Sequence, residues 1–290
     1  MNLLLRTASQ IVNPLDSRRR FGFGSGVSGA EAFIGPLDAY ASGLAGAWSV
    51  SRRLLATYTG PLFRVRRSSD STEQDINATA LGTVDTTALL AFCGSGSGFI
   101  RTVYDQKTGT ALNLDQTTAL SQPRIVNAGS VELYGMYLDG SNDCLDTSSQ
   151  TWSTFGGAQA VQMVVKQRIP SGGNTRLIDF GPNNIGVWHV FSGQTYWDSP
   201  VTGGRINYTP ASPTGAVKTL SFERDGGASR IRVDGTVEHS GSGLSGTMSG
   251  TSILRLGALA SGASYWLGWV SDFVIWQNAT DAAGRAAALA

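Results

Sequence analysis

The side chains that most often do chemistry in enzymes are few in this chain. There are two histidines, His189 and His239, and two cysteines, Cys93 and Cys144. Two separated cysteines cannot form a disulfide framework, and two histidines give little material for a zinc site or a histidine-based triad. The sequence also has no P-loop, no Cys-x-x-Cys pair and no Gly-x-Ser-x-Gly elbow. We therefore expect no cofactor.

One short stretch carries oxygen ligands at close spacing. Asp139, Asn142 and Asp143 occur in the segment LDGSNDCLD, and such hard oxygen ligands can bind Ca²⁺. The same residue types also form turns at the ends of strands, because Asp and Asn side chains accept hydrogen bonds from nearby backbone N–H groups. We favour the turn and keep calcium as the alternative.

Aromatic residues suggest a binding site rather than a catalytic one. Six of the seven tryptophans follow residue 150, and several aromatic and amide side chains gather around one predicted hairpin. Aromatic faces can stack on sugar rings, with polar neighbours as hydrogen-bonding groups. The alternative is that Trp188 and Trp197 are core or subunit-interface residues. The candidate carbohydrate-binding residues are Trp188, His189, Tyr196, Trp197, Asn183, Asn184 and Asp198.

Composition favours a loop-rich β protein. The chain has 290 residues, 37 glycines and only 15% charged residues, and a chain of this length can bury a core without disulfides or metals. The formal net charge of +1 argues against a dedicated nucleic-acid binder. Nine Lys and Arg but only three Asp and Glu lie before residue 68, so the two ends of the chain differ in charge.

The first 34 residues predict an extended arm. They lack sustained periodicity and pass through an arginine run into FGFGSGVSG, whose glycines suit an arm better than a packed element. We expect this arm to dock onto its own body or onto a neighbour in an assembly. The residues assigned to docking are Arg18, Arg19, Arg20, Phe21 and Phe23.

The next segment mixes helices and strands. The pattern at 48–58 predicts a short buried helix that Gly60 and Pro61 end, and the alternation at 62–67 predicts a half-buried strand. Asp85 is a plausible N-cap for a helix over 86–93, which would make Cys93 a small core residue. A glycine loop then leads into a strand over 99–106.

After Pro123, eight short apolar or alternating runs each end in turn residues. They lie at 131–140, 160–169, 176–181, 185–193, 218–226, 229–235, 252–259 and 266–276. Such spacing predicts a two-sheet sandwich. Asp225-Gly226 predicts a hairpin tip, Asp234-Gly235 opens the next turn, and the alanine-rich 280–290 predicts a terminal helix capped by Thr280 or Asp281.

Nothing in the sequence indicates export or membrane insertion. MNLLLRTASQ holds only three consecutive leucines, too few for a signal-peptide core, and no run approaches the roughly 20 apolar residues of a membrane span. We expect a soluble protein made in a cytoplasm.

Two parts of the chain resemble known families. The segments SFERDGGASRIRVDGTVEHSG, LRLGAL and YWLGWVSDFVIWQNATDAAGRAAAL resemble the closing half of concanavalin-like or laminin-G-like jelly rolls. GPLDAYASG, LLATYTGPLFRVRRSSDSTEQDI, LAFC and TVYDQ are similar to the catalytic domain of the α-L-arabinofuranosidase B type of glycoside hydrolase. The resemblance implies an all-β, concanavalin-like two-sheet jelly-roll sandwich over 35–290, with entry portion 35–122, main strands 123–279 and terminal helix 280–290, after an arm at 1–34.

The resemblance also implies two catalytic carboxylates, and neither position holds one. Alignment puts Trp188 at the nucleophile position and Ser261 at the position of the aspartate, and the cysteine partner of the Phe-Cys position is replaced near Gly98. The start of another sandwich glycosidase motif at Glu223 and Asp225 lacks its second glutamate. We therefore predict no catalytic residues and lean against an enzyme.

These observations favour a non-catalytic structural or adhesion protein of a bacteriophage virion, in a tail, fibre or head decoration. Its sandwich would contact a host-surface glycan or neighbouring subunits, and its arm would bind other virion proteins. We expect a homo-oligomer, with a trimer favoured, and no nucleic acid or membrane partner. The alternatives are a glycoside hydrolase of the α-L-arabinofuranosidase type and a soluble lectin.

Overall fold

Short antiparallel strands make up most of the chain in the computed structural model, which describes residues 32–107, 112–151, 161–168, 173–181, 185–198, 206–209, 215–225, 228–242, 251–277 and 282–289. From Phe33 onward these residues belong to one compact unit. The strands are β1 Leu44–Ser49, β2 Phe63–Arg67, β3 Glu73–Ile76, β4 Gly98–Val103, β5 Leu114–Asp115, β6 Arg124–Asn127, β7 Ser130–Val131, β8 Met136–Asp139, β9 Leu145–Asp146, β10 Gln150–Thr151, β11 Val161–Arg168, β12 Thr175–Gly181, β13 Ile185–Phe191, β14 Gln194–Asp198, β15 Ile206–Tyr208, β16 Val217–Asp225, β17 Ala228–Val233, β18 Thr236–Ser242, β19 Thr251–Leu256 and β20 Leu267–Gln277.

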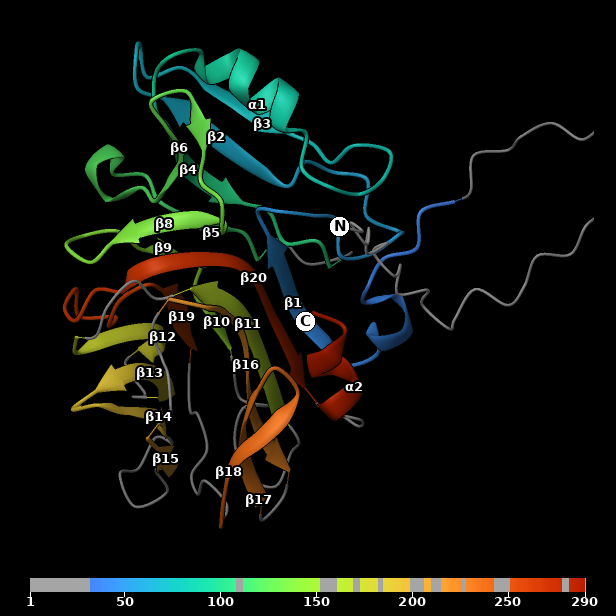
Figure 1. Ribbon diagram of the computed structural model, residues 1–290, viewed down its shortest axis with the longest axis vertical. Coiled ribbons are helices and arrows are strands. Elements are labelled where there is room, and N and C mark those ends of the chain that lie inside the picture. The colour runs from blue at the N-terminus through green and yellow to red at the C-terminus, as the bar shows by residue number, and fades with distance from the viewer. Residues whose placement is uncertain are drawn as a thin grey trace, which may run out of the picture. The chain divides into compact units, whose positions relative to one another are not determined.

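Helices are few and short. The α-helices are α1 Thr86–Cys93 and α2 Ala282–Ala287, and the 3-10 turns are η1 Asp38–Tyr40 and η2 Ala119–Ser121. Figure 1 shows α1 above β2 and β3, and α2 beside β1 near the C-terminus. The predicted helices over 86–93 and near the C-terminus are therefore confirmed, although the predicted caps of α2, Thr280 and Asp281, lie outside the described residues.

Two layers of antiparallel strands form the sandwich. One layer runs β18-β17-β16-β11-β20-β1. The other runs β15-β14-β13-β12-β19-β9. In Figure 1, β12 to β15 stand at the left of the lower part and β16 to β18 at its right. The predicted all-β sandwich is confirmed, because each of the eight predicted runs contributes a strand.

Apolar side chains from both layers fill the space between them. Phe222 on β16 meets Trp197 on β14 with ring centroids 5.5 Å apart, and Phe273 on β20 stacks on Trp48 of β1 at 5.3 Å. All four rings belong to one buried cluster. Burial of such side chains supplies most of the free energy that favours the folded state.

The other face of β1 and β20 has a second apolar cluster. Leu44 and Ala47 of β1 and Val274 and Trp276 of β20 are buried there, and Leu289, which follows α2, packs on them. Since both faces of β1 are covered, every residue of this strand is buried. Such a strand has a continuous apolar pattern rather than an alternating one.

The helix predicted over 48–58 is wrong. Trp48 and Ser49 end β1 and pair with Phe273 and Asp272 of β20. The chain then bends, because the Ser49 hydroxyl accepts hydrogen bonds from the N–H groups of Ser51 and Arg52. Serine side chains that bind nearby backbone in this way compete with helix formation.

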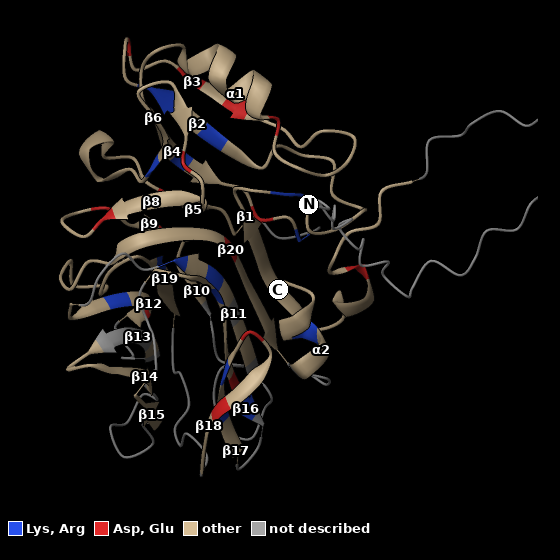
Figure 2. Cartoon of the chain, viewed as in Figure 1, with Lys and Arg blue, Asp and Glu red and all other residues tan. Residues whose placement is uncertain are grey.

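Two of the three arginines of β2 pair with aspartates. Arg64 forms two hydrogen bonds to Asp75, and Arg67 forms two to Asp70. Figure 2 shows basic residues on β2 and acidic residues in neighbouring segments. Asp105 instead accepts the backbone N–H groups of Ala47 and Lys107. The two Arg–Asp pairs are exposed by a third or more, so each contributes little to stability.

Some sequence predictions concern residues that the structure does not describe. Arg18, Arg19, Arg20, Phe21 and Phe23 lie outside the described residues, so the docking arm stays a prediction. Among the described residues, no helix is both long and apolar enough to span a membrane.

Replacement of Asp85 by alanine should destabilise the protein by about 1 kcal/mol, because Asp85 accepts the N–H of Ala88 at 2.9 Å and so caps α1. Urea unfolding measures the change. Thr87→Ala, at an exposed position in the first turn of the same helix, is the control. Equal unfolding midpoints for the two variants would contradict a capping role.

Candidate functional site

The loop between β19 and β20 packs against β12 and against the turn between β8 and β9. Gly257 donates its N–H to the carbonyl of Leu177 on β12, and Trp266 donates to the carbonyl of Gly257. Gly257 has φ +98°, and a Cβ there would lie 2.3 Å from the Leu138 side chain and 3.1 Å from the Asp143 carbonyl. The absence of a side chain therefore lets this loop approach the turn between β8 and β9.

A bidentate ion pair fixes the first part of this loop. Arg255 donates from Nε and Nη2 to the two carboxylate oxygens of Asp146, both at 2.7 Å, and its Nη1 donates to the carbonyls of Leu259 and Ala260. The hydrogen bond to Asp146 raises the pKa of Arg255 above its usual value. Because the guanidinium of Arg255 donates four hydrogen bonds, this side chain connects β9, β19 and the loop.

A second ion pair lies directly beneath the loop. Arg176 and Asp179 on β12 are both buried and bonded to each other, and the second oxygen of Asp179 accepts the N–H of Ala260 at 2.8 Å. Arg176 also donates its backbone N–H to Ser264 at 2.8 Å. A buried charge is tolerated when it is paired in this way, so the pair determines where the loop lies on β12.

The two positions that the resemblance assigned to catalytic acids border this pair. Trp188 on β13 is the cross-strand partner of Arg176, and Ser261 follows Ala260 in the loop and is exposed. Each position is thus adjacent to one member of the ion pair, Trp188 by strand pairing with Arg176 and Ser261 along the chain from Ala260, which binds Asp179. Neither residue is a carboxylate, so acid chemistry here needs carboxylates from other segments.

Asp143 has a carboxyl group whose pKa is raised to near neutral pH. Its side chain is 6% exposed, and one oxygen accepts the N–H of Asp139 at 3.0 Å. Burial, followed by the nearby charge of Asp139, raises the pKa of Asp143 to about 7. Figure 2 shows the red acidic end of β8, where exposed Asp139 lies. A buried and an exposed carboxyl group on one turn can divide acid and base roles.

The predicted calcium ligands form a turn. Asp139 accepts the N–H groups of Ser141 and Asn142, while Asp143 accepts that of Asp139. These bonds are the turn chemistry that was the favoured interpretation. Among the described residues, no group of three or more His, Cys, Asp and Glu side chains could hold a metal ion.

The structure places the aromatic residues of the predicted carbohydrate site in different environments. Trp197 is 3% exposed and packs in the core against Phe222, so its ring face is covered, as the core alternative expects. Tyr196 is 9% exposed and donates its hydroxyl to Gln194. Trp188, His189 and Asp198 are described as strand backbone without their side chains, and Asn183 and Asn184 lie outside the described residues. Sugar binding by this hairpin stays a prediction.

Two ion pairs, the buried Arg176–Asp179 pair and the partly buried Arg255–Asp146 pair, are the part of the site that the sequence analysis missed. The sequence does indicate the Arg176–Asp179 pair. These two residues interrupt the otherwise apolar run RLIDFG, and charged residues are rarely buried unless they are paired. The pairing of Asp146 with Arg255 spans more than a hundred residues, and no local pattern indicates it.

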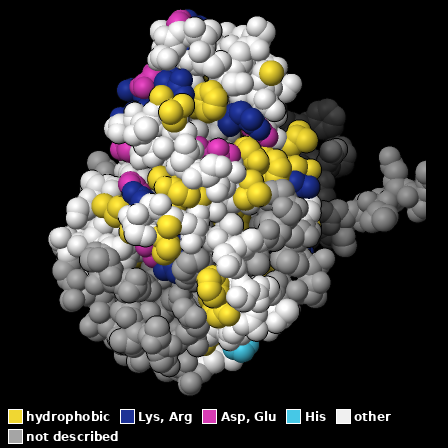
Figure 3. Space-filling view, turned by 90° about the vertical axis from the view of Figure 1, so that its left-hand side faces the viewer, with side chains coloured by type: hydrophobic (Ala, Val, Ile, Leu, Met, Phe, Trp, Pro, Cys, Tyr) yellow, Lys and Arg dark blue, Asp and Glu magenta, His cyan; other side chains and the backbone are white. Residues whose placement is uncertain are grey.

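Figure 3 shows the side of the molecule that lies at the left in Figure 1, where β8 and the antiparallel strands β12 to β14 reach the surface. Acidic and basic side chains lie next to each other there, among hydrophobic ones, in the part of the surface that is not grey. No broad area of one charge covers this described surface, which fits recognition of a mostly uncharged ligand better than of a polyanion.

Comparison with known proteins gives one family. The model of the family "Alpha-L-arabinofuranosidase B, catalytic" matches residues 36–198. An alpha-L-arabinofuranosidase of Hypocrea jecorina is 35% identical over 95 residues, which cover 32% of this chain and 19% of that protein. Alpha-L-arabinofuranosidase B of Emericella nidulans is 38% identical over 93 residues, covering 31% and 18%. The matched segments thus span about a fifth of these relatives.

The fold is shared over a longer stretch. A crystal structure of an arabinofuranosidase complexed with arabinofuranosyl-alpha-1,2-xylobiose superposes with a TM-score of 0.68 and 17% identity, covering 88% of this chain and 64% of that one. A structure of an arabinofuranosidase soaked with a cyclic sulfate inhibitor gives 0.64 and 15%. At these identities the superpositions show the fold alone.

These matches overturn the predicted biological setting. The non-catalytic virion protein, with its tail, decoration and host-attachment roles and its location in a virion, is wrong, because the relatives are fungal arabinofuranosidases. The missing acids at Trp188 and Ser261 do not outweigh a family match over residues 36–198. The hydrolase, which was the alternative, agrees with the matches.

The raised pKa of Asp143 predicts a pH-dependent stability. The folded-state pKa of about 7 lies above the ordinary 3.8, so the native protein binds more protons than the unfolded chain between those values. Stability should therefore fall as pH rises from about 4 to 7, by up to a few kcal/mol. Asp143→Asn should reduce this slope.

Urea unfolding of the wild type and of Asp143→Asn at several pH values measures the effect. Asp234→Asn, at an exposed turn between β17 and β18, is the matched control and should keep the wild-type slope. Identical slopes in the wild type and Asp143→Asn would refute a raised pKa.

Proposed function

The chain belongs to the family of α-L-arabinofuranosidase B catalytic domains, and from this premise we propose that it is a glycoside hydrolase that removes terminal α-L-arabinofuranosyl groups. The match over residues 36–198, more than half of the chain, carries this proposal. The substrate class comes from the relatives, whose names include alpha-L-arabinofuranosidase and arabinofuranosidase/B-xylosidase. One superposed structure holds arabinofuranosyl-alpha-1,2-xylobiose.

Hydrolysis of a glycosidic bond requires two carboxyl groups. One donates a proton to the leaving oxygen, and the other acts as nucleophile or base. The proton donor needs a pKa near the working pH, so that it is protonated when the substrate binds and can release the proton during the reaction. Of the carboxyl groups that the structure describes, Asp143 is the one for which burial and a neighbouring charge raise the pKa to about 7.

We assign the second carboxyl group to Asp139. It is exposed, lies on the same turn and raises the pKa of Asp143 by its charge, so the two groups are close. The backbone N–H groups of Ser141 and Asn142 hold one of its oxygens. The turn lies against Gly257, where the β19–β20 loop with Ser261 begins. The carboxyl groups of this turn would therefore replace those missing at the two aligned positions.

The buried Arg176–Asp179 pair and the partly buried Arg255–Asp146 pair support this arrangement. Arg255 with Asp146, and Arg176 with Asp179, fix the β19–β20 loop through its carbonyls and one N–H. Asp146 follows Asp143 by three residues, so its ion pair also anchors the end of the turn. A rigid support of this kind is what holds catalytic groups in one geometry.

The experiment is hydrolysis of 4-nitrophenyl α-L-arabinofuranoside by the purified full chain. We expect release of nitrophenol, with kcat lowered about 10²-fold or more in Asp143→Asn, because general acid catalysis contributes about 10²–10⁴-fold. Asp139→Asn should also lose most activity, whereas Asp234→Asn should retain it.

The outcomes separate the activity from its residue assignment. A wild-type protein without turnover would overturn the hydrolase. Full activity in Asp143→Asn would leave the hydrolase standing and show that another group donates the proton. Circular dichroism of each variant establishes that a loss of turnover does not come from unfolding.

A further inference from the structure

Tyr137 lies on the same face of β8 as Asp139, one of the two carboxyl groups of the proposed site. Residues two apart on a strand point to the same side of the sheet, with Cα atoms about 7 Å apart. Met136 and Leu138, which alternate with them, are buried in the core, whereas Tyr137 is half-buried and Asp139 is exposed. The Tyr137 side chain therefore stands on the outer face, next to the Asp139 carboxylate.

The ring of Tyr137 is held between two flat groups from neighbouring strands. Trp269 on β20 is its cross-strand partner, with ring centroids 4.8 Å apart. On the other side of β8, Arg124 of β6 pairs with Tyr137, and the central carbon of its guanidinium lies 4.9 Å from the centre of the ring. Ring–ring and guanidinium–ring contacts are both favourable. They fix the direction in which the hydroxyl group points.

Glu132 holds both flanking groups in place. One of its carboxylate oxygens accepts Nε of Arg124 at 2.8 Å, and the other accepts Nε1 of Trp269 at 2.9 Å. Trp269 also contacts the guanidinium of Arg168 at 5.0 Å and the ring of Tyr134 at 5.8 Å. We call Arg124, Glu132 and Trp269 the clamp. Packing and hydrogen bonds of this kind are what position a binding group precisely.

The hydroxyl group at the end of the held ring is not used by the fold. Among the residues that the structure describes, it forms no hydrogen bond. The hydroxyls of Tyr58 and Tyr104, by contrast, donate to the Pro61 carbonyl at 2.6 Å and to Asp75 at 2.8 Å. A phenol hydroxyl both donates and accepts hydrogen bonds, so that of Tyr137 is free to bind a ligand.

Both carboxyl groups of the proposed site act on this hydroxyl. Burial raises the pKa of Tyr137, the positive charge of Arg124 opposes the rise, and the charges of Asp139, Glu132 and Asp143 add to it. The phenol therefore stays protonated near neutral pH, where Asp143 has its own pKa. It is a hydrogen-bond donor under the conditions in which the site would work.

We propose that Tyr137 is a substrate-binding residue, whose hydroxyl donates a hydrogen bond to one hydroxyl of the arabinofuranosyl ring bound at the β8–β9 turn. This assignment rests on the proposed function, because Asp139 and Asp143 locate the ring. The clamp positions Tyr137 and does not itself touch the sugar. A site that binds a substrate hydroxyl in this way discriminates against a sugar that lacks it.

The test compares the wild type with Tyr137→Phe, which keeps the ring in the clamp and removes the hydroxyl alone. The substrates are 4-nitrophenyl α-L-arabinofuranoside and its 2-deoxy, 3-deoxy and 5-deoxy analogues. We expect the variant to have a kcat/KM about two- to tenfold lower on the complete sugar, as for the loss of one hydrogen bond. On one analogue the difference should vanish, because both partners of that bond are then missing.

Tyr104→Phe is the matched control. It also removes one tyrosine hydroxyl, the one that donates to Asp75, and it should lower kcat/KM on no substrate selectively. Glu132→Ala tests the clamp. Its preference for the complete sugar over the informative analogue should fall toward that of Tyr137→Phe, a change in selectivity that a loss of stability alone does not give. Glu132→Gln, which can still accept one of the two bonds, should lie between Glu132→Ala and the wild type.

A binding measurement separates this residue from the activity. Calorimetry with methyl α-L-arabinofuranoside, on Asp143→Asn to prevent turnover, should give a Kd that Tyr137→Phe raises about two- to tenfold. A wild type that hydrolyses nothing, together with this change in Kd, would overturn the hydrolase and leave the role of Tyr137 standing.

The opposite pattern would overturn the role of Tyr137. Turnover by the wild type, with Tyr137→Phe equal to it on every substrate or reduced equally on all of them, would show that the hydroxyl does not contact the sugar and would leave the hydrolase standing. Neither turnover nor binding by the wild type would overturn both proposals. Circular dichroism of each variant establishes that it is folded.

Discussion

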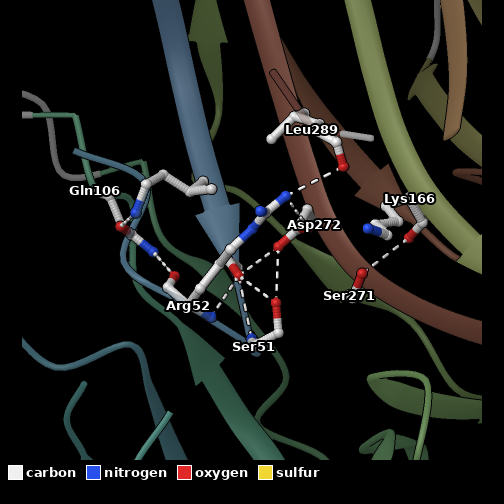
Figure 4. A network of polar contacts seen from close by, with 9 residues as sticks. Ser51, Arg52, Gln106, Lys166, Ser271, Asp272 and Leu289 are labelled. Atoms are coloured by element: carbon white, nitrogen blue, oxygen red, sulfur yellow. Dashed lines mark hydrogen bonds and ion pairs between the residues drawn. The ribbon is translucent and has the colours of Figure 1, made fainter. Parts of the chain in front are cut away.

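The interactions of the buried Asp272 carboxylate connect the two ends of the compact unit that begins at Phe33 (Figure 4). A carboxylate that is almost fully withdrawn from water is tolerated only if hydrogen-bond donors surround it. Here the donors come from Ser49, Ser51 and Arg52, at the end of β1. Arg52 in turn reaches the carbonyl of Leu289 after α2. One charge therefore ties the start of the compact unit to its end.

The same constraint explains what the sequence could and could not predict. Strands such as β16 and β17, with their alternating apolar residues and turn signals, are recognisable from local pattern, and so is α1 with Asp85 as its cap. The segment after Trp48 is not a helix, although its apolar spacing is compatible with a helix. What decides it is pairing with β20 and bonding to Asp272, more than two hundred residues away.

The candidate site, like the fold, could be predicted from the sequence only in part. The sequence located Asp139 and Asp143 and their turn chemistry, and it identified Trp188 and Ser261 as the positions that matter. It could not show that both positions border a buried Arg–Asp pair, because strand register and loop docking create that neighbourhood. It also could not show the burial that raises the pKa of Asp143. Absence of acids at two aligned positions is therefore weak evidence against membership of the family.

The central claim is that this sandwich cleaves α-L-arabinofuranosyl groups. Proton NMR of the full chain with arabinofuranosyl-alpha-1,2-xylobiose, the ligand in the superposed arabinofuranosidase structure, tests it most directly. The account predicts that the anomeric signal of the linked arabinofuranosyl group declines while signals of free arabinose and xylobiose grow, at a rate proportional to protein concentration. An unchanged spectrum at high protein concentration would contradict it.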